Sequence, residues 1–132
     1  MVKIHDTQFE KIVAGAIDAI PSPYIDRLEN VAFIVESEPT QQQAKMLGLR
    51  CHDLLFGLYE GVPLPRRMGA TKLLPDKITL FKNPLLSISK DMAELTTNIK
   101  HTIWHEVAHY YGLNHDRIHE IENKKHSKRH SY

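Results

Sequence analysis

The sequence is organised around residues 91–116, which read DMAELTTNIKHTIWHEVAHYYGLNHD. Residues 91–111 are mostly good helix formers, and they predict one helix of about five turns. Apolar residues recur at the spacing that places them on one broad face of this helix. They are Met92, Leu95, Ile99, Ile103, Val107 and Tyr111. His105 and His109 fall on the opposite side, so we expect a core face and a separate histidine face that forms the floor of a cleft.

Residues 105–109 read HEVAH and match the pattern H-E-x-x-H. Residues four apart on a helix lie one above the other, so both imidazoles can reach one zinc ion, which accepts neutral imidazole nitrogen. A carboxylate beside such a site can take a proton from a metal-bound water, which then attacks a carbonyl that the zinc polarises. The motif therefore predicts His105 and His109 as ligands and Glu106 as the general base of peptide or amide hydrolysis. His101, one turn before His105, is expected to be solvated.

Gly112 provides a place for the predicted helix to end. Glycine favours the left-handed conformation that closes helices, and a chain that turns there can bring a later side chain back to the same ion. His115 completes the pattern H-E-x-x-H-x-x-G-x-x-H, and Asp116 is the alternative third ligand. Catalytic zinc sites normally take three protein ligands and leave the fourth position to water. We therefore expect one zinc ion per chain, held by the two helix histidines and by His115 or Asp116.

Patterns elsewhere in the chain predict a small mixture of helices and strands. An amphipathic helix is expected over residues 7–19, capped by Asp6 or Thr7. The further expected elements are a helical turn at 23–28, a buried strand at 31–35, a surface helix at 39–47 ended by Gly48, a strand at 53–60, and a strand at 77–81 stopped by Asn83 and Pro84. Gly57 indicates a bulge or a close backbone approach, and residues 61–74 are typical of a long loop.

The composition is typical of one globular domain over residues 1–132. The chain is 42% hydrophobic and 25% charged, and its 17 Lys+Arg nearly balance its 16 Asp+Glu. That balance makes a nucleic-acid partner unexpected, and we interpret the basic residues 124–132 as a frayed tail. The single cysteine excludes an internal disulfide framework, and no apolar run is long enough to span a membrane. We therefore expect a cytoplasmic protein without a membrane partner.

Together these segments resemble the small bacterial zincin-like metallopeptidases, whose minimal zincin fold carries the motif HExxHxxGxxH or HExxHxxGxxD. The resemblance covers residues 9–21, 31–36, 58–64, 74–81 and 105–115. It implies an α+β fold in which a small mixed β-sheet packs against an N-terminal helix and the long HExxH helix. It also implies a zinc metallopeptidase, a hydrolase that acts on peptide or protein substrates. Many members have aspartate at the third ligand position, whereas this chain has His115 there and Asp116 next to it.

The larger metzincins share the full motif and add a downstream turn with a methionine beneath the metal. Only 17 residues follow His115, and none of them is methionine. This chain therefore has the metal motif without the usual second subdomain. We expect a cleft with one developed wall, which binds substrate weakly or needs a protein partner to complete it.

Two other functions remain open from the sequence. His105, His109 and His115 also satisfy the His-x3-His-x5-His spacing of bacterial rRNA-processing endoribonucleases. Those enzymes typically have glycine where this chain has Glu106, and they carry a Thr-Asp-Val-Leu-Ser-Phe-like segment that is absent here. The second alternative is a catalytically weak, metal-stabilised binding module. Four protein ligands around the metal would indicate such a module, because no position would be left for water.

Overall fold

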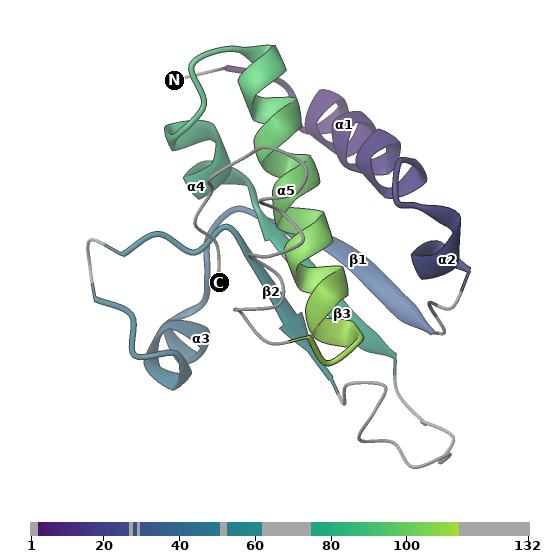
Figure 1. Ribbon diagram of the computed structural model, residues 1–132. Helices are drawn as coiled ribbons and strands as arrows, with labels where there is room; N and C mark the ends of the chain where they lie inside the picture. The colour runs from purple at the N-terminus through teal and green to yellow at the C-terminus, as the bar shows by residue number, and fades with distance from the viewer. Residues whose placement is uncertain (1–2, 27, 29, 51–52, 62–74, 114–132) are drawn as a thin grey trace.

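The computed structural model of the chain describes residues 3–26, 28, 30–50, 53–61 and 75–113 (Figure 1). Its elements in chain order are α1 (Asp6–Asp18), α2 (Ser22–Ile25), β1 (Val31–Glu36), α3 (Gln41–Met46), β2 (Gly57–Glu60), β3 (Asp76–Phe81), α4 (Lys82–Ser87) and α5 (Met92–Tyr110). The fold is α+β with a small mixed sheet, as the sequence predicted. Within the described residues, no helix has the length and apolar character that crossing a bilayer requires.

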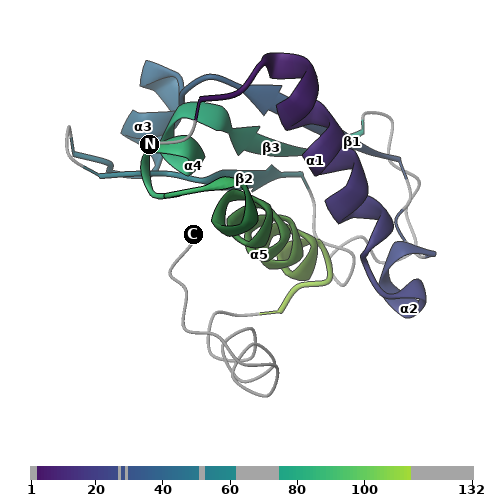
Figure 2. The same ribbon diagram turned by 90° about the horizontal axis from the view of Figure 1, so that it is seen from above.

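The three strands form one sheet in the order β1-β3-β2, so β3 is central. β1 runs parallel to β3, with Val31 opposite Asp76. β2 runs antiparallel to β3, with Gly57 opposite Leu80 and Tyr59 opposite Ile78. As an edge strand, β2 has one side paired with β3 and the other side open to α5, which lies next to it in Figure 2. The HExxH helix therefore contacts both β2 and the central strand β3.

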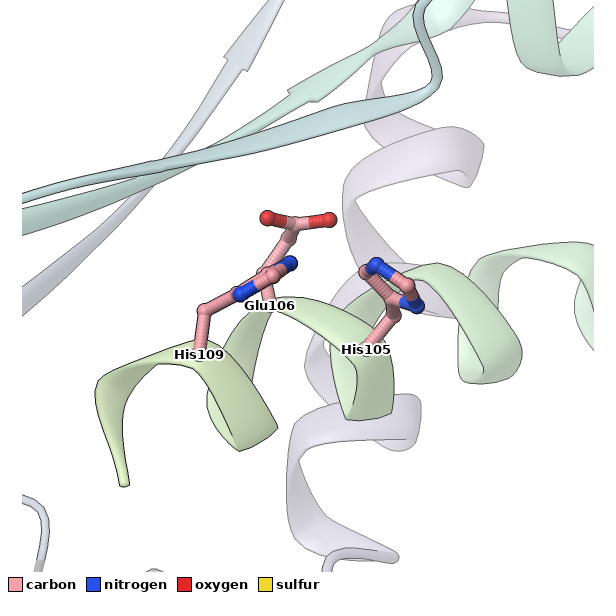
Figure 3. Close-up of side chains that lie close together, drawn as sticks. All are labelled: His105, Glu106 and His109. Carbon is pink, nitrogen blue, oxygen red and sulfur yellow. The ribbon is translucent and has the colours of Figure 1, made fainter. Parts of the chain in front are cut away.

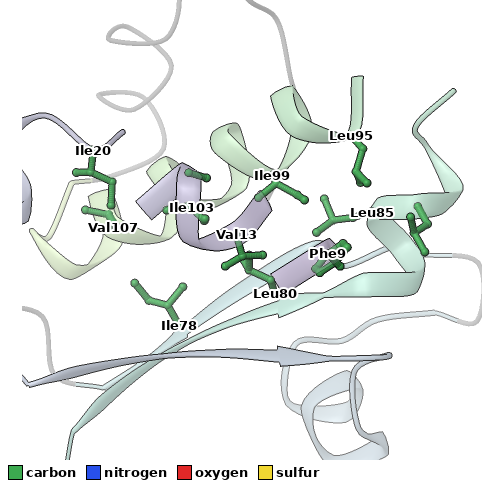
Figure 4. Close-up of a cluster of buried hydrophobic side chains, with 12 residues drawn as sticks. Phe9, Val13, Ile20, Ile78, Leu80, Leu85, Leu95, Ile99, Ile103 and Val107 are labelled. Atoms are coloured by element: carbon green, nitrogen blue, oxygen red, sulfur yellow. The ribbon is translucent and has the colours of Figure 1, made fainter. Parts of the chain in front are cut away.

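The core lies between the sheet and the two long helices, α1 and α5 (Figure 4). Ile78 and Leu80 project from β3 into it, and Phe9 and Val13 reach it from α1. Complete burial of such a side chain contributes roughly 1.5–3 kcal/mol to folding. The sheet thus packs against the N-terminal helix and the HExxH helix, which confirms the architecture expected from the family resemblance.

The predicted core face of α5 is confirmed through the middle of the helix and differs at its two ends. The buried members of that face are Leu95, Ile99, Ile103 and Val107. Met92 is 41% exposed, in the first turn of the helix. Tyr111, which follows the last turn, is partly buried, and its hydroxyl donates a hydrogen bond to the backbone carbonyl of Tyr24. The apolar pattern therefore identifies the core face but not how far the core extends along it.

The cap predicted for α1 is wrong. The helix already begins at Asp6, and His5 is its N-cap residue. The Gln8 side chain accepts a hydrogen bond from the His5 N–H at 3.1 Å, which replaces the predicted pairing at Thr7. The carboxylate of Asp6 instead pairs with Lys82 Nζ, and this pairing lowers the pKa of Asp6. The Asp6 side chain, which local spacing predicted as a cap, therefore forms a tertiary ion pair instead.

The strands follow the predicted order with different extents. β1 begins at Val31 as expected, but it is half-buried rather than buried because it lies at a sheet edge. The strand expected over 53–60 is limited to Gly57–Glu60. Of the loop expected over 61–74, only Gly61 is among the described residues. The expected tail 124–132 lies outside them.

Asn83 and Pro84 do not simply stop the chain after β3. They belong to the short helix α4, which begins directly at Lys82. Proline is tolerated in the first turn of a helix, because the N–H groups there have no intrahelical partner. Leu85 and Leu86 of α4 are buried. The burial of these leucines explains why the segment forms a helix where proline predicted only a strand end.

Two glycines end helices as predicted. Gly48 follows α3 with φ 67°, and Gly112 follows α5 with φ 77°. At the end of α5 the Gly112 N–H donates to the His109 carbonyl at 2.9 Å, and the Leu113 N–H donates to the Ala108 carbonyl at 3.1 Å. This pair of hydrogen bonds is the Schellman arrangement. The helix therefore ends at Tyr110, one residue after the second histidine of the motif, and the chain turns at Gly112.

Replacing Gly112 with alanine is expected to lower the free energy of unfolding by about 1–2 kcal/mol, because an L side chain disfavours the left-handed conformation by that amount. Urea denaturation of the metal-free protein measures the change. Gly15→Ala is the matched control: Gly15 is exposed within α1, and a Cβ added there meets nothing within 4 Å. Alanine at Gly15 should stabilise the protein by about 0.5–1 kcal/mol. Equal effects at the two positions would contradict the assigned helix ending.

Candidate metal centre

The motif residues come together near the C-terminal end of α5 (Figure 3). One possible ligand atom from each of His105, Glu106 and His109 lies within 4.8 Å of the other two. The two imidazole rings have centroids 4.8 Å apart and meet edge-on at 72°. Because residues four apart share one helix face, the helix itself sets this spacing. Both imidazoles can therefore approach one ion without any change in the backbone.

The histidine side of α5 is separate from the core face, as expected, but it is largely covered rather than open to solvent. His105 and Glu106 are each 1% exposed, and His109 is partly buried. Val107 and Ala108 are buried as well, so four successive residues of the helix are covered. The apolar side faces the core, while β2 lies against the side that carries Glu106. A helical projection of α5 alone contains no information about this second covering element.

Glu106 extends from α5 to the backbone of β2. Its Oε1 accepts a hydrogen bond from the Tyr59 N–H at 3.0 Å. Its Oε2 is buried and has no hydrogen-bond partner among the described residues. Burial raises the pKa of the Glu106 carboxyl well above its usual range, and the hydrogen bond from Tyr59 partly opposes that rise. One oxygen is thus fixed in place, while the other is available to take up a proton.

Tyr59 connects the motif to the central strand, and sequence reasoning missed it. Besides its backbone bond to Glu106, its hydroxyl donates to Asp76 Oδ2 at 2.7 Å. Asp76 is only 4% exposed, and the Tyr59 ring packs edge-on against Tyr110 at 6.2 Å between centroids. The one sequence signal near this contact was Gly57, and its predicted close approach is confirmed by the packing of β2 on α5. Tyr59 itself carries no motif that could have identified it.

The end of α5 is also held by aromatic packing from α2. Tyr24 meets Trp104 edge-on, with ring centroids 4.9 Å apart. It meets Tyr111 in the same manner at 5.6 Å. Edge-to-face pairs of this kind contribute about 0.5–1.5 kcal/mol beyond their buried area. The motif therefore lies on a stretch of helix that is supported by both α2 and β2.

The donor set suits a divalent metal such as zinc. Two imidazoles at helical spacing are typical zinc ligands, and a nearby cation would offset the unfavourable burial of the Glu106 carboxylate. His101 is partly buried and is not a member of the group that can hold a metal within the described residues. The predicted third ligands, His115 and Asp116, lie outside the described residues.

The buried carboxylate predicts a change in the stability of the metal-free protein. The pKa of Glu106 is higher in the folded chain than in the unfolded chain. As the pH rises between these two pKa values, the unfolded chain loses the proton first, and the free energy of unfolding therefore falls. Glu106→Gln removes this effect and keeps an oxygen for the Tyr59 N–H. At neutral pH with a chelator present, we expect the variant to be more stable by about 1–3 kcal/mol. The difference should shrink toward the ordinary glutamate pKa.

Urea denaturation across this pH range measures the effect. Glu10→Gln is the control, since Glu10 is exposed on α1. A Glu106→Gln protein that is no more stable than wild type at neutral pH would contradict the burial of an ionisable group at this position.

The chain is similar to known proteins in both its sequence and its fold. A family model described as zincin-like metallopeptidase matches residues 28–125, a range that contains the sheet, α5 and both predicted third ligands. Among solved structures, a conserved hypothetical protein from Thermus thermophilus is similar, with a TM-score of 0.55 and 16% sequence identity. The match covers 91% of this chain and 99% of that protein, and at this identity it shows a shared fold only. No curated protein sequence matches.

Proposed function

The chain belongs to the zincin-like metallopeptidase family, and we propose that it is a zinc-dependent peptidase acting on peptide or protein substrates. The observation that carries the proposal is the group of buried His105, buried Glu106 and partly buried His109, whose ligand atoms lie within 4.8 Å of one another. Ionisable side chains are rarely buried without a partner or a function. Family membership supports metal-dependent hydrolysis as that function.

We assign two metal ligands to His105 and His109. His115 is the proposed third ligand, with Asp116 as the alternative, and we expect one zinc ion per chain. The Schellman turn at Gly112 supports this assignment, because it redirects the chain shortly before these residues. Zinc bound at such a site supplies a Lewis acid that polarises the scissile carbonyl and increases the acidity of water.

Glu106 is the proposed general base. The Tyr59 N–H holds Oε1, so that Oε2 is the atom that accepts a proton from the attacking water. Glu106 then delivers this proton to the nitrogen of the leaving amine. The raised pKa of the carboxyl favours retention of the proton between the two steps. His109 is more exposed than His105, so we propose that substrate approaches from the His109 side.

The cellular setting of the proposed peptidase follows from composition. One cysteine and a near-neutral charge suit a protein of the reducing cytoplasm that has no membrane or nucleic-acid partner. A protein partner that completes the cleft is part of the proposal. The family match and the buried Glu106 support the peptidase over an rRNA-processing endoribonuclease that uses His105, His109 and His115.

A peptide-library cleavage assay with zinc-loaded protein tests the proposal. We expect cleavage that a chelator suppresses and that added zinc restores. An rRNA cleavage assay on the same preparation is the comparison. Cleavage of rRNA without cleavage of peptides would move the function to the nuclease class. Zinc-loaded protein that cleaves neither substrate would reject the peptidase and favour the metal-stabilised binding module.

A further inference from the structure

Gly57, the first residue of β2, lies where the strand comes closest to α5. A Cβ added to this glycine would lie 2.5 Å from Thr102 Cγ2 and 3.2 Å from Glu106 Cγ. The first separation is shorter than any ordinary contact between carbon atoms, so the strand and the helix cannot both stay in place. Gly57 does not have a positive φ, since Gly48, Gly61 and Gly112 are the described glycines that do. The requirement for glycine is therefore one of space.

Thr102 cannot easily move away from the strand. It is buried at 3% exposure, and its Oγ1 donates to the Asn98 carbonyl at 2.8 Å. A β-branched side chain in a helix has few χ1 choices, and rotation here would break this buried hydrogen bond. Asn98 is itself held through its Nδ2, which donates to Ser89 Oγ at 3.0 Å. The methyl group of Thr102 is thus held in place at the point where β2 packs against α5.

Asn98, Thr102 and Glu106 follow one another at intervals of four along α5, so they lie on one side of the helix. All three are buried, and the last two contact the position of Gly57. Two residues after Gly57 along β2, the Tyr59 N–H bonds Glu106 Oε1. The distance between β2 and α5 at Gly57 therefore determines whether that hydrogen bond can form.

We propose that Gly57 and Thr102 are positioning residues that set the spacing between β2 and α5 and thereby hold the Glu106 carboxylate on the Tyr59 N–H. The catalytic consequence rests on the proposed function, whereas the hydrogen bond does not. Neither residue contacts the proposed metal ligands through any contact described above. They act through Glu106, which Figure 3 shows pointing from α5 toward the sheet.

Gly57→Ala tests the proposal, with the Tyr59 backbone amide followed by NMR. The inserted methyl group should separate the strand from the helix and move this amide signal toward its position in Glu106→Ala, which has no acceptor. Hydrogen exchange at the Tyr59 amide should become on the order of tenfold faster. Gly15→Ala, at a glycine with open space, should leave the signal in place.

The second variant restores the missing space. Thr102→Ser removes Cγ2 and keeps the hydroxyl that bonds Asn98, so Gly57→Ala/Thr102→Ser should return the Tyr59 amide close to its wild-type position. Gly57→Ala/Thr102→Val keeps a methyl group at the contact and should not. In the peptidase assay, Gly57→Ala should lower kcat by on the order of tenfold to a hundredfold with little change in KM, and the serine double variant should recover most of it. Zinc content should stay at the wild-type level.

Three outcomes would overturn the proposal. The first is a Gly57→Ala protein whose Tyr59 amide is unchanged. The second is a Gly57→Ala/Thr102→Ser protein that behaves like the single variant, including the case in which both fail to fold. The third is equal recovery by serine and valine at Thr102. If the protein hydrolyses no peptide at all, the proposed function fails, but the amide measurements still test the spacing contact.

Discussion

We expect the His109→Ala protein to purify without zinc and the wild-type protein to carry about one zinc ion per chain. His105 and His109 form the only pair of imidazoles in the metal-capable group of the described residues. Removing one of them leaves His105 as the single imidazole of that group, and a site with one ligand fewer cannot close around the ion. Elemental analysis after mild purification and reconstitution measures this loss directly.

His101→Ala is the matched control for that experiment. His101 precedes His105 by one helical turn, as His105 precedes His109, yet it is not part of the group. The control should therefore keep its zinc. Zinc should raise the melting temperature of the wild type and of His101→Ala, because a ligand that binds only the folded state stabilises it. It should not do so for His109→Ala. Full zinc content in His109→Ala, or loss in the control, would reject the assigned ligands.

The fold was predictable where its determinants lie within one segment. The helix expected over 91–111 is found at Met92–Tyr110, because its apolar spacing, its N-cap and its terminal glycine are all local. The cap of α1 was not predictable in the same way, since Asp6 pairs with Lys82, which is distant in sequence. Likewise, the helix that contains Pro84 forms because leucines next to it are buried in the tertiary structure.

The same distinction between local and tertiary determinants applies to the candidate site. His105, Glu106 and His109 could be predicted because the helical repeat alone brings them together. The contact between Tyr59 and Glu106 spans 47 residues and uses a backbone N–H, which every residue except proline has. No side-chain pattern can identify such a donor. Only Gly57 indicated a close approach, and it did not identify the partner.

The burial of the motif also depends on a tertiary contact, so the sequence did not predict it. Amphipathic spacing distinguishes one side of a helix from the other, but it does not state whether the polar side meets water or a second element. In this chain β2 covers that side, so Glu106 is held away from solvent. Burial also raises the pKa of the Glu106 carboxyl above its usual range, a property that the spacing of the motif alone does not indicate.

Glu106→Gln is expected to keep its zinc and to lose peptide hydrolysis by at least about a hundredfold. Glutamine retains the size of the side chain and an oxygen that can accept the Tyr59 N–H, so neither the helix nor the ligands should be disturbed. The amide cannot accept a proton at the position of Oε2. The loss should therefore appear in kcat, because it affects proton transfer rather than substrate binding. Initial rates on a cleaved library peptide, together with zinc analysis, measure both quantities.

Glu10→Gln again serves as the control and should leave both rate and zinc content unchanged. The loss of hydrolysis in Glu106→Gln is more informative when the stability of the metal-free variant is measured as well. A substitution that removes a costly buried charge should stabilise the fold while it abolishes turnover, which is the trade-off expected of a residue retained for function. A Glu106→Gln enzyme that retained hydrolysis would show that another group takes the proton. A variant that lost zinc along with activity would instead place Glu106 among the metal ligands.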